Sequence, residues 1–199
     1  VQNNQGITEK RLQENLAFAK NAYDSFESIR GTGMTGWAEI INYNKDEIQD
    51  IVDTANDIRK NFKYFVVLGI GGSALGPIAV FQALCHLHYN DLPDSLRNGP
   101  KFYVEDNVDP ERMKALLDVI DLDKTIFNVV TKSGATSETM AQYLIIMNLL
   151  KEKYGDKAKD HMIATTSESK GNLIKIAKQE GLKTFYIPDG VGGRFSELC

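Results

Sequence analysis

Three stretches of the chain gather the residue types that bind and stabilise anions. They read GIGGSALGP at Gly69–Pro77, TKSGATSET at Thr131–Thr139 and GVGGRFSEL at Gly190–Leu198. Glycines let backbone amides approach a ligand closely, hydroxyl groups donate hydrogen bonds to its oxygens, and an arginine supplies a rigid fork of charged donors. Together the three stretches predict a site for a negatively charged small molecule.

The first stretch has the form of a turn between a strand and a helix. Gly69, Gly71 and Gly72 follow an apolar run, and Ser73 stands where an N-cap hydroxyl is expected. The positive end of the helix dipole would then face the turn and favour an anion. Gly69-x-Gly71-x-x-Ala74 also satisfies the relaxed dinucleotide fingerprint, and a glycine-rich turn without any ligand is a third interpretation.

The second stretch places five hydroxyl side chains within nine residues. Capping the following helix needs only one of them, Thr136 or Ser137. The other hydroxyls, the backbone amides freed by Gly134 and the ammonium of Lys132 form a concave set of donors that suits a phosphate monoester.

The third stretch delivers Arg194 from a run of glycines, an arrangement typical of an oxyanion or phosphate ligand. The alternative is a surface arginine that pairs with Asp189. The segment Thr165–Ser169 is also rich in hydroxyls, and we expect it to cap the helix that follows.

Alternating apolar runs and helical patterns from Tyr64 onward predict an α/β fold with a parallel sheet. The expected strands are Tyr64–Leu68, Lys101–Glu105, Thr125–Thr131, His161–Thr165 and Thr184–Ile187. The expected helices are Ser73–Tyr89, Pro110–Ile120, Thr136–Tyr154 and Ser169–Gln179, preceded by helical patterns over residues 7–30 and Asp46–Asn61. Ligands of such sheets lie at the carboxyl ends of the strands, where all three stretches fall.

Composition narrows the classes of partner. The 199 residues carry 23 Lys and Arg against 27 Asp and Glu, a net charge of −4, without a basic run, which argues against nucleic acid. No apolar run is long enough to span a membrane. Two cysteines and three histidines lack metal-ligand spacing, so we expect no metal and a reducing, cytoplasmic compartment.

The three motifs and their order resemble those of the glucose-6-phosphate isomerase family, bacterial type. The resemblance extends over nearly the whole chain, including the segment GWAEIINYNKDEI that starts at Gly36. The second motif is shared by sugar isomerase (SIS) domains in general, and the third is specific to the isomerase.

The resemblance implies a helical arm over residues 1–60 and a SIS domain over residues 61–199, a three-layer αβα sandwich with five parallel strands. It implies a cytoplasmic homodimer of glycolysis and gluconeogenesis that interconverts glucose 6-phosphate and fructose 6-phosphate without a cofactor. By the same resemblance Gly72 and Ser73 contact the substrate, Arg194 stabilises a cis-enediolate, and the phosphate is held by Thr131, Lys132, Ser133, Gly134, Ala135 and Thr136.

The family's proton-transferring glutamate and its ring-opening histidine lie beyond the arginine motif, so we expect this chain to be a fragment without the catalytic base. Two other functions stay open. One is a SIS module that binds sugar phosphates without catalysis. The other is an NAD-dependent dehydrogenase, in which Glu105 or Asp106 would bind the ribose.

Overall fold

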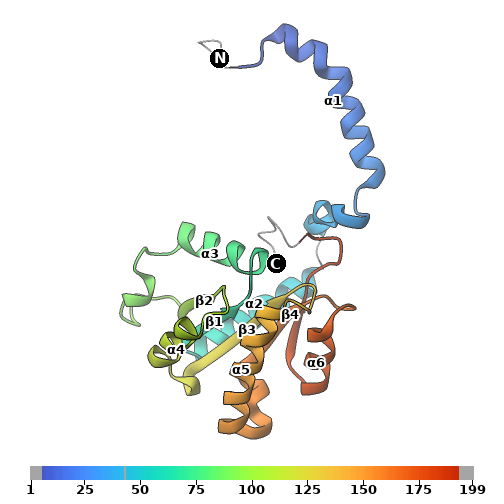
Figure 1. Ribbon diagram of the computed structural model, residues 1–199. Coiled ribbons are helices and arrows are strands. Elements are labelled where there is room, and N and C mark those ends of the chain that lie inside the picture. Colours follow the sequence, from blue (N-terminus) through green and yellow to red (C-terminus); the bar gives the residue numbers. More distant parts are fainter. Residues whose placement is uncertain (1–5, 43, 193–199) are drawn as a thin grey trace.

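The structure is a computed structural model that describes residues 6–42 and 44–192 (Figure 1). Its five strands form one parallel sheet in the order β2-β1-β3-β4-β5, which confirms the predicted α/β fold. The strands are β1 (Tyr64–Leu68), β2 (Lys101–Glu105), β3 (Thr125–Thr131), β4 (Met162–Thr166) and β5 (Lys183–Tyr186). The α-helices of the described residues are α1 (Glu9–Ile29), α2 (Lys45–Asn61), α3 (Gly72–Leu84), α4 (Pro110–Val119), α5 (Ser137–Tyr154) and α6 (Asn172–Glu180).

The central strand β3 explains why the sheet forms where it does. Its sequence TIFNVVT is apolar on both faces, and six of its seven residues are buried. Such a strand is stable only when helices cover both sides of the sheet.

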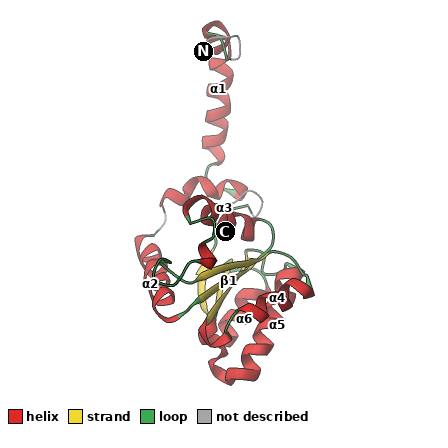
Figure 2. Cartoon of the chain, turned by 90° about the vertical axis from the view of Figure 1, so that its left-hand side faces the viewer, coloured by secondary structure: helices red, strands yellow, loops and turns green. Residues whose placement is uncertain are grey.

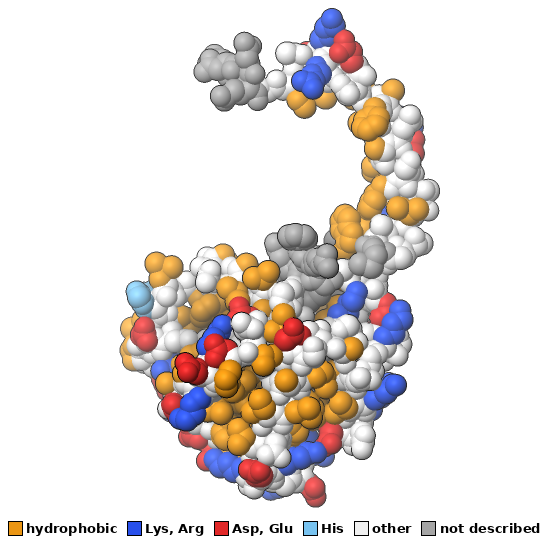
Figure 3. Space-filling model, in the orientation of Figure 1, with side chains coloured by type: hydrophobic (Ala, Val, Ile, Leu, Met, Phe, Trp, Pro, Cys, Tyr) orange, Lys and Arg blue, Asp and Glu red, His pale blue; other side chains and the backbone are white. Residues whose placement is uncertain are grey.

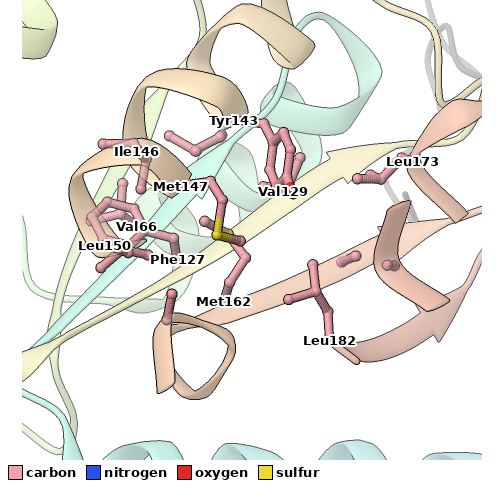
Figure 4. Close-up of a cluster of buried hydrophobic side chains, with 14 of the residues drawn as sticks. Val66, Phe127, Val129, Tyr143, Ile146, Met147, Leu150, Met162, Leu173 and Leu182 are labelled. Atoms are coloured by element: carbon pink, nitrogen blue, oxygen red, sulfur yellow. The ribbon is translucent and has the colours of Figure 1, made fainter. Parts of the chain in front are cut away.

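Helices α4, α5 and α6 cover one face of the sheet, and Figure 4 shows side chains of α5 and α6 packed against it. The strands contribute Val66, Phe127, Val129 and Met162 to this core, while the helices contribute Met113, Leu116, Tyr143, Ile146, Met147, Leu150, Leu173 and Ala177. Burial of these side chains is the main force that fixes the strand order.

Helices α2 and α3 cover the opposite face, which completes the three layers (Figure 2). Ile58 of α2 packs with Ile126 and Ile163 of the sheet. Phe81 of α3 lies against Phe102 of β2, with ring centroids 4.7 Å apart. Helix α2 therefore shares the core of the sheet, although it falls within the helical arm expected over residues 1–60. The division of the chain at residue 60 remains a prediction.

Helix α1 projects away from the sheet and has no buried residue (Figures 1 and 3). Its N-cap is Thr8, whose hydroxyl accepts a hydrogen bond from the amide of Arg11 at 3.2 Å. It is linked to the rest of the chain by the 3₁₀ segment Gly33–Asn42, where Trp37 packs on Phe26. Within the described residues, no helix combines the length and apolar character that a membrane span requires.

Two of the differences from the predicted helix starts have a local cause in a glycine. Helix α3 begins at Gly72, and its N-cap is Gly71, which has a positive φ of 59°, so Ser73 lies within the first turn and is not the cap. Helix α6 begins at Asn172, three residues later than predicted, because Gly171 (φ 91°) turns the chain just before it.

Candidate functional site

The candidate site lies where the strand order reverses. From β1 the chain passes to β2 at one edge through α3, whereas from β3 it passes toward β4 in the other direction through α5. The turns after β1 and β3 therefore diverge onto opposite faces of the sheet. This is the place at which open parallel sheets bind ligands.

Three hydroxyl groups of the 131–136 loop form a triangle. The Oγ1 atom of Thr131 lies 3.3 Å from Oγ of Ser133 and 3.2 Å from Oγ1 of Thr136, and the last two atoms are 3.3 Å apart. Each hydroxyl can act as donor or acceptor, so the three protons can rotate toward the oxygens of a ligand. We call these three groups the hydroxyl triangle.

The hydroxyl triangle is not used for helix capping. Thr136 is the N-cap residue of α5, but its side chain makes no capping hydrogen bond, and Ser137 donates to Oε2 of Glu138 instead. The expectation that one hydroxyl caps α5 is therefore wrong. All three hydroxyls of the triangle lie at a helix N-terminus, where the dipole favours an anion.

A close contact between two glycines shapes the 131–136 loop. The carbonyl of Gly134 accepts hydrogen bonds from the amides of Asn172 (3.0 Å) and Leu173 (3.3 Å), the first residues of α6. A Cβ atom on Gly171 would lie 2.1 Å from the carbonyl oxygen of Ser133. Only glycine fits there, and the contact places the N-terminus of α6 against the loop as well.

The ammonium of Lys132 is bound to the segment after β5. It donates to the carbonyl oxygen of Asp189 at 3.2 Å and to that of Val191. The sequence predicts this ammonium among the phosphate donors, whereas in the structure it ties the end of β3 to the segment after β5. A contact from Lys132 to phosphate remains a prediction.

The carboxylate of Asp189 is surrounded by donors from the segment after β4. Ser167 donates to it at 2.7 Å and Ser169 at 3.3 Å, and the ammonium of Lys170 lies 2.9 Å away. The hydrogen bond from Ser167, followed by that from Lys170, lowers the pKa of Asp189. This cluster accounts for the hydroxyls of Ser167 and Ser169, while those of Thr165 and Thr166 donate to Asn128 and to the carbonyl of Thr131. The predicted capping is wrong, since α6 has no side-chain cap.

The predicted arginine falls outside the described residues. Arg194 follows Gly192, the last residue that the structure describes. The alternative partner of Arg194, Asp189, has the three donors named above.

The glycine turn after β1 stands beside β2. The amide of Gly69 donates to the carbonyl of Glu105 at 3.2 Å, and a Cβ atom on Gly69 would come within 3.0 Å of the Cβ of Ser73. The turn closes locally, since the amide of Ser73 donates to the carbonyl of Ile70 at 3.2 Å. Substrate contacts from Gly72 and Ser73 remain predictions.

The acidic pair at the end of β2 gives no support to a dinucleotide site. Only 7% of Glu105 is exposed, and burial raises the pKa of its carboxyl although Arg112 opposes the shift. Asp106 is bound by the guanidinium of Arg112 at 2.7 Å. The strand order also matches the flavodoxin-like arrangement, with one strand beside β1 at the edge, and not the dinucleotide-binding order.

Two further observations on the described residues concern metal binding and an apolar cavity. No group of three or more histidine, cysteine, aspartate or glutamate side chains among them is placed to hold a metal ion. A cavity of ≈ 590 Å³ lies between α2 and α3, with Phe65, Phe81 and Phe102 in its wall. Its apolar lining is unsuited to a sugar phosphate.

Comparison with known proteins decides the family. Residues 6–199 match the model of the family described as phosphoglucose isomerase. The chain belongs to the phosphoglucose isomerase family. The fold class inferred from the sequence and the resemblance drawn from its three motifs are both confirmed.

Curated relatives in the phosphoglucose isomerase family carry the name glucose-6-phosphate isomerase. The protein of Carboxydothermus hydrogenoformans is 54% identical over 178 residues, which is 89% of this chain and 38% of the relative. That of Acetivibrio thermocellus is 36% identical over 96% of this chain and 44% of the relative. The chain thus spans about two fifths of the length of these relatives.

Two solved structures have a fold similar to that of this chain. A hypothetical protein from Thermus thermophilus has a TM-score of 0.73 at 34% identity, covering 95% of this chain and 43% of that one. A glucose-6-phosphate isomerase from Chlamydia trachomatis has a TM-score of 0.63 at 30% identity, covering 76% of this chain and 27% of that one.

Proposed function

We propose that this chain forms the phosphate-binding part of a glucose-6-phosphate isomerase, which interconverts glucose 6-phosphate and fructose 6-phosphate through an enediolate. The hydroxyl triangle carries the proposal, because its three groups lie within 3.3 Å of one another at the N-terminus of α5 and serve no capping role. Membership of the phosphoglucose isomerase family supports the choice of substrate.

Each part of the site has a role in this proposal. The 131–136 loop binds the phosphate through its hydroxyls and backbone amides, and Gly72 and Ser73 contact the substrate. Arg194 stabilises the negative charge that develops on the oxygens at C1 and C2. The base that moves the proton between these carbons comes from the part of the longer relatives that this chain does not cover. Such a proton transfer requires neither a metal nor an organic cofactor.

The proposal extends to the biological setting. The complete enzyme acts in glycolysis and gluconeogenesis in the cytoplasm as a homodimer, with sugar phosphates and not nucleic acid as its ligands. The net charge of −4 is consistent with the absence of a nucleic-acid partner.

Calorimetric titration of the 199-residue chain tests the proposal. Glucose 6-phosphate should bind and glucose should not, because the phosphate supplies the recognised group. A coupled assay of the same chain should show no sustained isomerisation, since the base is supplied elsewhere. Equal affinity for glucose and glucose 6-phosphate would contradict the assigned phosphate site, and turnover at about 1–10³ per second would contradict the assignment of roles.

A further inference from the structure

Gln142 is a buried amide on the face of α5 that packs against the sheet. Only 2% of it is exposed, and Tyr143 and Ile146 beside it belong to the apolar core. Its Nε2 donates to the carbonyl oxygens of Glu105 at 3.2 Å and of Asn107 at 3.0 Å. Both protons of the amide nitrogen are thereby used, and they join α5 to the end of β2.

The carbonyl oxygen of Glu105 is shared with the glycine turn after β1. It also accepts a hydrogen bond from the amide of Gly69 at 3.2 Å, and its two lone pairs allow both bonds at once. Gly69 begins the turn that leads to Gly72 and Ser73, the predicted substrate contacts. One oxygen atom therefore connects helix α5 with this turn.

Helix α5 also carries the hydroxyl triangle. Its N-cap is Thr136, which lies about 9 Å from Gln142 along the helix axis. The last residue pair that joins β1 to β3 is Leu68 with Val129, and beyond it the two loops diverge onto opposite faces of the sheet. The side chain of Gln142 continues the connection beyond that pair.

The carbonyl oxygen of Gln142 indicates that the amide is present for its donors. This Oε1 atom is buried and has no hydrogen-bond partner within the described residues. An unpaired buried oxygen costs free energy, whereas a methionine of similar size would fill the same space without that cost. An amide at this position is therefore less favourable for packing than an apolar side chain, and its two donors are what it adds.

We propose that Gln142 is a positioning residue that holds the glycine turn after β1 at a fixed separation from the hydroxyl triangle. The inference rests on the proposed function, because it treats both loops as parts of one substrate site. A sugar phosphate that contacts both loops binds more tightly when they are already held at the separation of its two ends. Inorganic phosphate reaches only the 131–136 loop and gains nothing from that separation.

The experiment compares the unaltered chain with Gln142→Met, which keeps the size of the side chain and removes both donors. Gln49→Met on the exposed surface of α2 is the matched control, because it also loses a side-chain donor, which bonds to Asp53 at 2.8 Å. Gln142→Asn keeps the amide but is one methylene shorter, and it gives a second test should Gln142→Met melt too low. Melting temperature, amide hydrogen exchange and calorimetric affinities for inorganic phosphate and glucose 6-phosphate are measured for each.

In both Gln142 variants, exchange at residues 69–73 should accelerate by about tenfold, while exchange at residues 131–136 stays unchanged. Affinity for glucose 6-phosphate should fall about tenfold, and affinity for inorganic phosphate should change less than about twofold. The Gln49→Met variant should change neither.

Unchanged exchange at residues 69–73, or an equal loss of affinity for both ligands, would overturn the inference and leave Gln142 a residue of the general fold. If the unaltered chain binds neither ligand, the proposed function fails. Exchange at residues 69–73 would still decide whether Gln142 restrains the turn.

Discussion

At the residue scale, Gly171 sets the shape of the proposed phosphate site without touching a ligand. Its φ of 91° is strained for any other residue, and an added Cβ atom would collide with the carbonyl of Ser133. Gly171→Ala should therefore lower the free energy of unfolding by about 1–3 kcal/mol and weaken binding of glucose 6-phosphate, as thermal melting and titration will report.

Gly155→Ala is the matched control for Gly171→Ala. Gly155 also has a positive φ (57°), but nothing lies within 4 Å of the position of its Cβ. The Gly155→Ala variant should lose stability from backbone strain while retaining its affinity for glucose 6-phosphate. Equal loss of affinity in both variants would show that the effect is global and that the glycine contact does not shape the site.

Burial of Glu105 predicts that the stability of the folded chain depends on pH. Desolvation raises the pKa of this carboxyl, its Oε2 has no hydrogen-bond partner, and Arg112 lies 3.5 Å away, too far for a hydrogen bond. The carboxyl of Glu105 therefore ionises more readily in the unfolded chain than in the folded one. Its ionisation lowers the free energy of unfolding as the pH rises above the pKa of the unfolded state, about 4.3.

Glu105→Gln should raise the melting temperature at pH 7, and the gain should shrink as the pH is lowered toward 4. Thermal melts of both proteins across this range give the measurement. A gain that is constant with pH would mean that ionisation of Glu105 is not the cause, and a loss at pH 7 would mean that the ion pair with Arg112 outweighs burial.

At the scale of elements, the arm helix is independent of the rest of the chain. Helix α1 has no buried residue, and it contacts the 3₁₀ segment through the ring of Phe26 on Trp37 and through a hydrogen bond from Thr35 to the carbonyl of Ile29. Deleting residues 1–24 keeps these contacts and should shift the melting temperature by less than about 2 °C, since a change of 1 kcal/mol moves it by about 2–4 °C. A larger fall would reveal packing of α1 that the structure does not contain.

The strands were predictable because their signal is local. Each contains adjacent apolar, aromatic or β-branched residues, and β1, β2 and β3 begin and end at the predicted residues. The starts of helices α3 and α6 were not predictable, because they depend on the conformations of Gly71 and Gly171, which the surrounding fold imposes.

The candidate site was predictable in its residue types but not in all its contacts. The density of hydroxyls in the 131–136 loop indicated a ligand site, and the structure brings Thr131, Ser133 and Thr136 together. The direction of Lys132 depends on Asp189, which is 57 residues away in sequence. No local pattern encodes such a contact, and the same holds for the meeting of Gly134 with Gly171.

At the scale of the whole molecule, the chain exposes more surface than a compact protein of its mass. Its accessible surface is 12824 Å², whereas a compact monomer of 22.2 kDa exposes about 9,400 Å². Part of the excess is the projecting arm, along which Figure 3 shows apolar side chains. These include Leu12, Leu16, Phe18 and Tyr23.

Small-angle scattering tests this shape. A compact chain of 199 residues has a radius of gyration of about 16 Å, and the projecting arm should raise the measured value clearly above it. Deletion of residues 1–24 should bring the value back toward 16 Å. A value near 16 Å for the intact chain would mean that α1 folds back onto the body.

Binding of phosphate by the hydroxyl triangle is the central claim, and Thr136→Val tests it most directly because it replaces a hydroxyl by a methyl of similar size. The matched control is Thr139→Val on α5, since the Oγ1 of Thr139 is buried without a hydrogen-bond partner. Calorimetric titration with glucose 6-phosphate should show a loss of about 1.5–3 kcal/mol for Thr136→Val, with its melting temperature preserved, and no loss for Thr139→Val. Unchanged affinity together with a lower melting temperature for Thr136→Val would show that the triangle is structural, and would contradict the account.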